Sequence, residues 1–330
     1  MDVFIEPAFR EFYAANPIVL IDVGASGGLQ GNWQFARKYL QIIGFEPDPR
    51  EFMSLEAKKN RDIRYFRTGL YRDKREIVFY LTSSQNASSI YRPNVGFLRQ
   101  FPESERFNII EETRIEVDAL DNVLKTNEVR DVDFVKVDTQ GSELAILEGA
   151  AQTLHAQIFG VEVEVEFVEM YKGQPLFHDV DRYLKDQGLH LFDIQKYYWK
   201  RTSGKNFYKK KGQVIFGNAL YLKTIDRVQQ MLQEYDDQNK KAKILKAFSI
   251  CFLYGYYDYA AELFGRFRGI FSEQESRAIN RFMARHVHMS HYFPSFKGRK
   301  LIADSIFHVW NMIRPTHHDW AVSDKDLGNV

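Results

Sequence analysis

The sequence contains almost no cysteine: Cys251 is the single one among 330 residues. One cysteine excludes a disulfide within the chain and is typical of a reducing compartment, so we expect a cytoplasmic protein. Cys251 lies in the apolar stretch FSICFLYGYY, which predicts a position in the hydrophobic core.

Long hydrophobic runs are lacking as well. No stretch approaches the about 20 apolar residues that are needed to span a bilayer. The stretch MDVFIEPAFREF at the start has acidic residues early and no apolar run of the kind that signal peptides contain. We therefore expect neither a transmembrane segment nor a signal peptide.

The chain also lacks an excess of charge of one sign. It carries 45 Lys and Arg against 44 Asp and Glu, a formal net charge of +1. Dedicated nucleic-acid binders usually show a basic excess, so the composition disfavours nucleic acid as a partner. The hydrophobic fraction of 45% is ordinary for a globular protein, and the length suits two domains or one large domain with an extension.

Buried strands alternate with helices through most of the chain. The expected strands are 18–23, 42–49, 63–70, 75–82, a short one from 114, one from 132, 157–167, 189–195 and 213–224. The expected helices are 32–40, 50–60, one from Asp121, one after the strand at 132, and 177–188. This pattern predicts an α/β fold with a doubly wound, mostly parallel sheet, in which the last strand could be antiparallel.

The pattern changes to helical periods after residue 224. We therefore predict a first domain over 1–224 and a helical C-terminal region over 225–330, whose role the sequence does not identify. The histidines of this region are predicted to be surface or packing residues: His286, His288, His291, His317 and His318.

The stretch IDVGASGGLQG (21–31) places small residues directly after a buried strand. Such a turn lets a ligand approach the backbone closely at the start of a helix. Ser26 stands where the dinucleotide fingerprint G-x-G-x-x-G needs its second glycine, which disfavours NAD. No Gly-Lys-Ser/Thr follows, so a P-loop is excluded.

Two acids accompany this turn. The second strand ends in Glu46, which can accept hydrogen bonds from the two hydroxyls of a ribose. Asp22 precedes the turn and suits a cationic ligand better than a pyrophosphate. NAD and S-adenosylmethionine both carry such a ribose, so Glu46 fits either ligand. Asp22 favours S-adenosylmethionine, a sulfonium with an ammonium group, over NAD. A turn without any ligand is disfavoured because the turn and Glu46 occur together.

Several motifs resemble those of FkbM-family methyltransferases, which are S-adenosylmethionine-dependent enzymes with a Rossmann-like fold of the class I methyltransferase type. The motifs are IDVGASGG (21–28), GFEPDP (44–49), NASSIY (86–91), VDALDNVL (117–124), VDFVKVDTQGSELAILEGA (132–150) and VEVEVEFVEMYKGQPLF (161–177). Lys136, Asp138, Gly141, Glu143 and Gly149 stand where the family pattern has them, whereas Ser26-Gly27-Gly28 departs from its commoner Asn-x-Gly form. The resemblance covers about 18–224 and implies O-methylation, often of sugars or polyketide-type hydroxyls.

The candidate site residues follow from these patterns. We expect the donor to be bound by Asp22, Gly24, Ala25, Ser26, Gly27, Glu46 and Asp138. Asp138 ends a central strand at the edge that faces the ligand crevice, and it is the first candidate for accepting the hydroxyl proton. Glu164 is the second candidate, and Lys136 lies on the same strand face as Asp138 and could pair with it. The alternative for Asp138 is that it caps the following helix.

Glu162, Glu164 and Glu166 alternate with valines and share one face of a strand. Three carboxylates on a buried face are costly without partners. Glu164 or Glu166 could hold a divalent cation together with Asp138, but no histidine-rich ligand set supports this alternative, and we predict no metal.

Two further segments are candidates for the acceptor side. Ser88 and Ser89 in NASSIY either line the pocket or form a polar turn. The segment 196–211, KYYWKRTSGKNFYKKK, carries seven basic and five aromatic residues and is either a solvated loop or an acceptor lid. Aromatic rings stack on sugars and lysines bind phosphates, so a phosphorylated or lipid-linked glycan would suit it.

The predicted function is therefore S-adenosylmethionine-dependent O-methylation of a sugar or glycan-type hydroxyl. One alternative is a non-catalytic Rossmann-like binding protein that uses its helical tail as an interaction module. Another is an NAD-dependent enzyme. The helical tail also offers a surface for a homo-oligomer.

Overall fold

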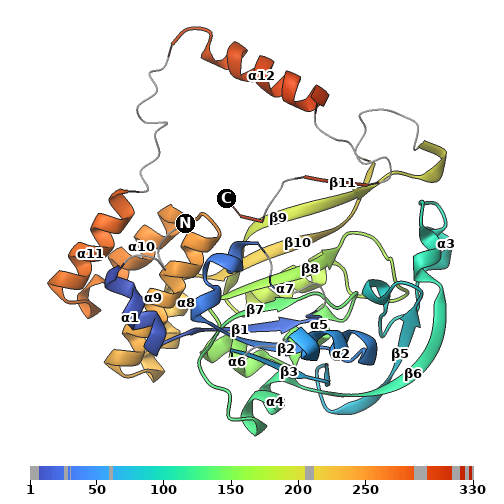
Figure 1. The fold of residues 1–330 in the computed structure, drawn as a ribbon, viewed down its shortest axis with the longest axis horizontal. Helices are drawn as coiled ribbons and strands as arrows, with labels where there is room; N and C mark the ends of the chain where they lie inside the picture. Colours follow the sequence, from blue (N-terminus) through green and yellow to red (C-terminus); the bar gives the residue numbers. More distant parts are fainter. Residues whose placement is uncertain are drawn as a thin grey trace.

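A computed structural model describes residues 7–25, 29, 31–58, 62–204, 212–285, 296–313, 320–323 and 327–328. Its centre is an eight-stranded sheet with the order β11-β9-β10-β8-β7-β1-β2-β3, and a second sheet has the order β4-β6-β5 (Figure 1). The strands of the large sheet are β1 Ile18–Val23, β2 Leu40–Phe45, β3 Ile63–Phe66, β7 Val132–Val137, β8 Gly160–Glu166, β9 Leu189–Trp199, β10 Gln213–Lys223 and β11 Trp320–Val322.

The five central strands β3, β2, β1, β7 and β8 are parallel, and β10 is antiparallel to both β8 and β9. β1 is buried over its whole length, as its unbroken β-branched sequence predicts. The predicted doubly wound, mostly parallel sheet is confirmed, and β10, the last predicted strand, is antiparallel.

Side chains of β1, β2 and β7 alternate between two cores. Leu20 belongs to a core with α1 Pro7–Ala15, α9 Asp237–Leu253 and α10 Tyr257–Phe267 on one face of the sheet. Ile21 belongs to a second core on the opposite face. The helices that contribute to that second core are α4 Leu120–Thr126, α5 Glu143–Glu148, α6 Ala151–Ala156 and α7 Phe177–Asp186.

The other helices are α2 Pro49–Lys58, α3 Val95–Leu98, α8 Ile225–Met231, α11 Glu273–Ala284 and α12 Arg299–Ile313. Helices thus dominate the chain after residue 224, as predicted. Phe248 and Cys251 of α9 pack in the same core as Leu20 and Phe134, so the C-terminal helices and the sheet share buried surface. The core position of Cys251 is confirmed, and the division into domains at residue 224 stays a prediction.

The structure departs from the sequence-based expectation at residues 32–40. Instead of a helix, two 3₁₀ turns span Asn32–Phe35 and Arg37–Tyr39, and β2 begins at Leu40. Trp33 explains this, because its buried ring packs against Phe134 and its Nε1 donates to Tyr254 Oη at 3.1 Å. Tertiary contacts thus override the local helical period.

The predicted strand 63–70 is divided between the two sheets. β3 ends at Phe66, and β4 Gly69–Leu70 pairs with β6 Ile109–Asp118 of the small sheet. β6 also pairs with β5 Arg75–Thr82, which precedes it by a long connection. β6 begins before the short strand expected at 114.

At the C-terminal side, β9 continues to Trp199, beyond its predicted end at 195, and β11 was not expected at all. The five histidines singled out in the tail lie outside the described residues. None of the helices that the structure describes is long and apolar enough to cross a bilayer.

A buried ion cluster joins the sheet to the C-terminal helices. Asp133 of β7 accepts from Lys243 Nζ at 2.8 Å and from Lys246 Nζ at 2.9 Å, and both lysines belong to α9. The backbone N–H of Val19 donates to the same carboxylate at 2.9 Å. All three charged side chains are nearly inaccessible to water, so their charges must be compensated within the cluster.

Replacing Asp133 by alanine would leave two buried lysines without their counter-charge. We expect Asp133→Ala to lower the free energy of unfolding by about 3–5 kcal/mol, as the loss of one member of a buried ion pair does. Urea denaturation would measure this. Arg277→Ala, which breaks an exposed ion pair with Glu273, is the matched control and should change stability little. Equal effects of the two substitutions would show that the cluster does not hold the layers together.

Candidate functional site

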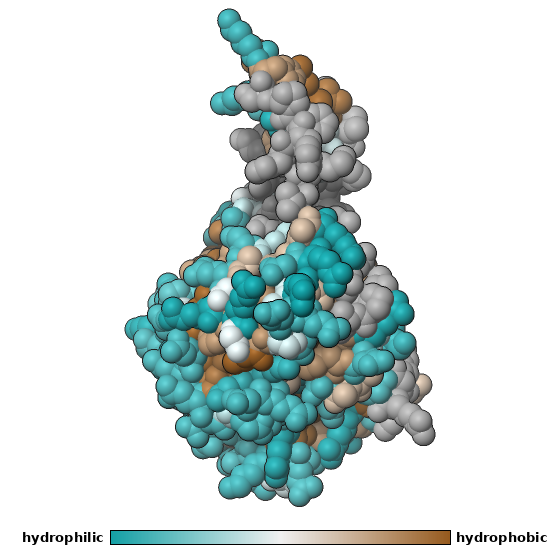
Figure 2. Space-filling view, turned by 90° about the vertical axis from the view of Figure 1, so that its left-hand side faces the viewer, coloured by the Kyte–Doolittle hydropathy of each residue, from teal (hydrophilic) through white to brown (hydrophobic). Residues whose placement is uncertain are grey.

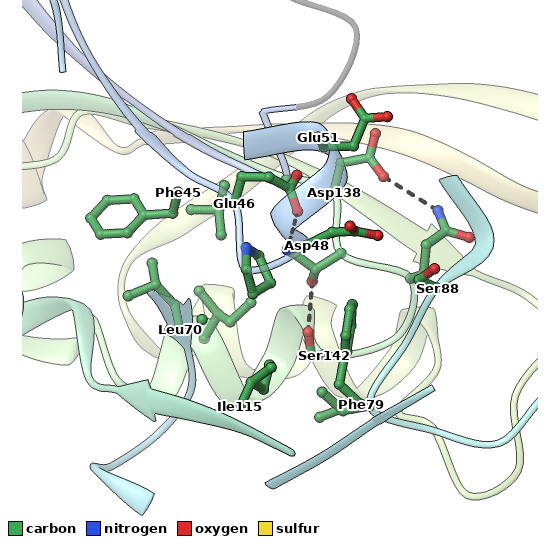
Figure 3. A pocket seen from close by; sticks show the side chains of 18 of the residues that line it. Phe45, Glu46, Asp48, Glu51, Leu70, Phe79, Ser88, Ile115, Asp138 and Ser142 are labelled. Atoms are coloured by element: carbon green, nitrogen blue, oxygen red, sulfur yellow. Dashed lines mark hydrogen bonds between the residues drawn. The ribbon is translucent and has the colours of Figure 1, made fainter. Parts of the chain in front are cut away.

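A cavity of about 220 Å³ opens at the carboxyl ends of β1, β2 and β7, between the large and the small sheet. Five acids line it: Glu46, Asp48, Glu51, Asp138 and Glu164. Apolar side chains, among them Phe45, Leu70, Phe79 and Ile115, line the other side, as Figure 3 shows. No lysine or arginine occurs among the lining residues in the described part of the chain. The cavity is therefore acidic on one side and apolar on the other.

Gly24 lets the chain after β1 lie directly against the residue that follows β7. It has a φ of +74°, and a Cβ at this position would lie 1.9 Å from the carbonyl oxygen of Asp138. Only glycine tolerates both conditions. Gly24 lines the cavity. Ala25, also a predicted donor contact, is buried and does not line the cavity. The predicted donor contacts Ser26 and Gly27 lie outside the described residues.

Glu46 follows β2 and points into the cavity (Figure 3). Its Oε1 accepts a hydrogen bond from the backbone N–H of Asp48 at 2.9 Å. Burial raises the pKa of Glu46 to about 7, and the nearby acids Asp48, Glu51 and Asp22 add to this effect. A ligand that donates hydrogen bonds to this carboxylate would stabilise its ionised form.

Asp22 and Lys136 lie below the cavity and do not line it. Lys136 Nζ is 3.4 Å from Asp22 Oδ1 and 3.9 Å from Asp138 Oδ2. Burial disfavours the ammonium, but Asp22, Asp138 and Glu162 together raise the pKa of Lys136 above its ordinary value. Lys136 and Asp138 thus lie close together, as predicted. The cation beside Asp22 is Lys136 of the protein itself.

Gln140 joins the two predicted proton acceptors. Its Nε2 donates to Glu164 Oε2 at 2.5 Å and lies 3.4 Å from Asp138 Oδ1. Its Oε1 accepts from the hydroxyl of Tyr171 at 3.0 Å, and its carbonyl oxygen accepts from Ser89 Oγ at 2.6 Å. The φ of Gln140 is +59°, a conformation that costs energy in a residue other than glycine and that clusters at functional sites. Sequence reasoning missed Gln140, whose only signal was its place in VDTQGSE.

Glu143 fixes the loop between Asp138 and α5. Its carboxylate accepts from the backbone N–H groups of Thr139 at 2.8 Å and Gly141 at 2.9 Å. Ser142 occupies the N-cap position of α5. Asp138 therefore does not cap this helix, and its side chain, 39% exposed, faces the cavity.

Glu143, Glu164 and Glu166 each place one carboxylate oxygen within 4.8 Å of the others. Such oxygens are ligands that divalent cations prefer. The alternative cation site considered from the sequence included Asp138, and Asp138 is not part of this set. Backbone and amide donors already bind Glu143 and Glu164. The prediction that no metal is used stays a prediction. Glu162 lies apart and accepts from the Tyr254 hydroxyl at 2.7 Å.

Burial raises the pKa of all three clustered carboxyls, to about 7 for Glu143 and well above the ordinary value for Glu164 and Glu166. Neighbouring acids contribute to the shifts of Glu164 and Glu166. The cluster therefore retains protons in the folded protein at a pH at which isolated glutamates are ionised.

Of the predicted acceptor residues, Ser88 lines the cavity and Ser89 binds Gln140 instead. The first part of the basic segment 196–211 continues β9 as far as Trp199, whose ring packs against Phe101 and Phe107. Residues 205–211 lie outside the described part of the chain. A role of this segment as a lid thus stays a prediction.

Comparison with known families gives one match. Residues 22–191 match the family described as "Methyltransferase FkbM domain", which is just over half of the chain. The match lies within the predicted first domain and includes every described candidate site residue. Together with the strand order it assigns the class I methyltransferase type of Rossmann-like fold. No protein with a curated description matches the chain.

Solved structures show more distant likenesses. A methyltransferase FkbM from Methylobacillus flagellatus KT is 15% identical with a TM-score of 0.37, and the match covers 63% of this chain but only 44% of that one. A precorrin-6y C5,15-methyltransferase from Geobacter metallireducens GS-15 is 11% identical with a TM-score of 0.31, covering 65% and 87%. A Burkholderia thailandensis 1,6-didemethyltoxoflavin-N1-methyltransferase, with bound 1,6-didemethyltoxoflavin and S-adenosylhomocysteine, is 12% identical with a TM-score of 0.28, covering 68% and 81%.

The raised pKa of Glu166 predicts how stability depends on pH. An unfolded chain releases this proton near the ordinary pKa of 4.5, whereas the folded protein retains it to a much higher pH. The unfolded state therefore binds fewer protons above that value, and stability falls as pH rises. We expect Glu166→Gln, which cannot ionise, to be more stable than the parent at pH 8 and equal to it near pH 4.

Urea midpoints at pH 4, 6 and 8 would test this. Glu105→Gln replaces an exposed glutamate and is the control, which should follow the parent at every pH. A Glu166→Gln variant that is less stable than the parent at pH 8 would mean that the cluster is ionised and compensated.

Proposed function

Because this chain belongs to the FkbM methyltransferase family, we propose that it transfers the methyl group of S-adenosylmethionine to a hydroxyl of a sugar or glycan-type acceptor. The observation that carries the proposal is the cavity with five acids and no basic residue among its described lining residues. Such a surface suits a sulfonium with an ammonium group and repels the pyrophosphate of a dinucleotide.

The lining residues fit the parts of this donor. Glu46 is placed to accept hydrogen bonds from the two ribose hydroxyls at the end of β2. The apolar surface of Leu70, Ile115 and Ile146 offers a place for the adenine ring. Gly24 keeps the backbone open where the donor would cross the end of β1.

When bound, S-adenosylmethionine supplies an electrophilic methyl group on a positively charged sulfur. The task left to the protein is to hold the acceptor hydroxyl in line and to take up its proton. Asp138 is the first candidate for this proton because it is partly exposed to the cavity. Glu164 is the second, but because burial raises its pKa it can accept a proton only at a pH high enough to ionise it. Gln140 holds both carboxyl groups in place.

Lys136 is a positioning residue in this scheme. It does not line the cavity and lies below Asp138, where its charge balances Asp22 and Asp138. The cytoplasm as the compartment and a homo-oligomer through the tail stay predictions.

The raised pKa of Glu46 makes donor binding dependent on pH. Only the ionised carboxylate accepts hydrogen bonds from both hydroxyls, so donor affinity should rise between pH 6 and pH 8 and level off above the pKa of about 7. Glu46→Gln should weaken binding about 10–100-fold, the value of charge-assisted hydrogen bonds, and abolish the pH dependence.

Calorimetry with S-adenosylmethionine and S-adenosylhomocysteine at pH 6, 7 and 8 would measure this. Glu105→Gln serves again as the control and should bind like the parent. Binding of neither compound to the parent protein would contradict the proposal and favour a non-catalytic binding protein. Binding of NAD alone would favour an NAD-dependent enzyme instead.

Removal of the proton acceptor should lower turnover and spare donor binding. We expect Asp138→Asn to reduce the rate about 10²–10⁴-fold, the usual contribution of a general base, with Glu164→Gln the smaller effect. The assay is transfer of labelled methyl to a panel of nucleotide sugars and cell-envelope sugars. Unchanged turnover in both variants would remove these carboxylates from the role, and a panel without any labelled sugar would contradict the proposed acceptor class.

A further inference from the structure

The helix α12 exposes an unusual concentration of apolar side chains. Every residue from Leu301 to Trp310 is exposed. Six of the large apolar side chains that the structure leaves exposed belong to this helix: Leu301 (73%), Ile302 (52%), Ile306 (65%), Phe307 (62%), Val309 (57%) and Trp310 (46%). Figure 1 shows the helix apart from the body of the molecule, and brown apolar atoms appear on this arm in Figure 2. Apolar surface on this scale indicates a partner.

Most apolar and polar residues of α12 occupy different sides, although Leu301 falls on the polar side and Arg299 on the apolar side. Lys300, Asp304 and His308 follow one another at intervals of four residues and form one polar stripe. Ile302, Ile306 and Val309 follow the helical period on the other side, and the rings of Phe307 and Trp310 stack at 5.9 Å. The helix is thus amphipathic with a broad apolar side that carries large rings.

The charge at the start of this helix is positive. Lys297, Arg299 and Lys300 are exposed, and Asp304 is the one acid among residues 296–310. Cations in the first turn oppose the helix dipole, which favours acids there, and so they do not stabilise the helix itself. A basic, amphipathic helix with an exposed tryptophan has the composition of helices that lie in a membrane interface. Anionic headgroups are the charge complement of this end.

The length and the attachment of α12 fit a helix that lies on a membrane. Its 15 residues measure about 22 Å, which is short of the roughly 30 Å of a hydrocarbon core. The chain that follows returns as β11, in which Trp320 pairs with Trp199 at the carboxyl end of β9. The cavity opens at the carboxyl ends of β1, β2 and β7 in the same sheet.

We propose that α12 docks the protein on an anionic phospholipid surface, with Ile302, Ile306 and Val309 toward the acyl chains. Docking through α12 would bring the edge of the sheet at which the cavity opens near the lipid headgroups. A glycan acceptor held on a lipid would then reach the cavity. This last step rests on the proposed function, whereas the membrane contact does not.

Flotation of the full chain with vesicles tests the contact. Vesicles of phosphatidylglycerol and phosphatidylcholine (one to three) should bind the protein, and pure phosphatidylcholine should bind it much more weakly. The double variant I306D/V309D should lower the bound fraction at least tenfold. His308→Asp adds an acid to the polar stripe instead and is the matched control, with a change of less than threefold expected. Replacing Lys297, Arg299 and Lys300 by glutamine should cost about fivefold for each cation.

Because α12 is exposed, these variants should keep the thermal unfolding midpoint of the parent. Absence of binding to the anionic vesicles would overturn the proposal, as would equal binding of the parent and I306D/V309D. A parent that sediments as a dimer, becomes a monomer in I306D/V309D and does not bind vesicles would assign the helix to a second copy of the chain. Vesicle binding without binding of S-adenosylmethionine in calorimetry would retain the docking and refute the proposed function.

Discussion

The close approach of β1 and β7 at their carboxyl ends is the constraint on which the cavity depends. Gly24 lies so close to the carbonyl group of Asp138 that no side chain fits between them. Two backbone hydrogen bonds hold the strand ends together, from Asp138 N to Val23 O and from Gly24 N to Phe45 O, each of 3.0 Å. They place the ends of β7 and β2 on either side of β1, and with them Asp138 and the residue after Phe45, Glu46. The two acids that the proposed reaction needs are therefore positioned by backbone contacts.

Strand β7 and the residue after it also carry three of the charged side chains that form ion pairs inside the protein. Asp133 at its start binds two lysines of α9, Lys136 in its middle lies between Asp22 and Asp138, and Asp138 at its end enters the cavity. One six-residue strand thus connects the C-terminal helices to the site. Burial and neighbouring acids raise the pKa values of Glu164 and Glu166 on β8, and these two carboxyls therefore retain protons. Neutralisation by lysine on one strand and by protonation on the next makes a buried acidic site compatible with folding.

The sequence predicted the parts of the site that follow from strand ends. Buried runs located β1, β2 and β7, and the residues after them gave Gly24, Glu46 and Asp138, which all line the cavity. It could not predict Gln140, because a positive φ outside glycine leaves no compositional trace. Nor could it show that Lys136 neutralises Asp22 from the next strand, since the register of β1 on β7 is a tertiary property. The helix expected over 32–40 failed for a similar reason, as the burial of Trp33 decides that segment, and a strand of three residues such as β11 has no pattern to detect.

The pairing of β11 with β9 has a consequence for synthesis of the chain. β9 is complete at Trp199, but its partner begins only at Trp320, so at ordinary translation rates the interval is on the order of ten seconds. Throughout that time the outer backbone groups of β9 are open to any other extended strand in the crowded cell. Lys196 near the end of β9 places a charge where such a strand would have to join. Such a charge disfavours mispairing at the open edge of β9 until β11 has been synthesised.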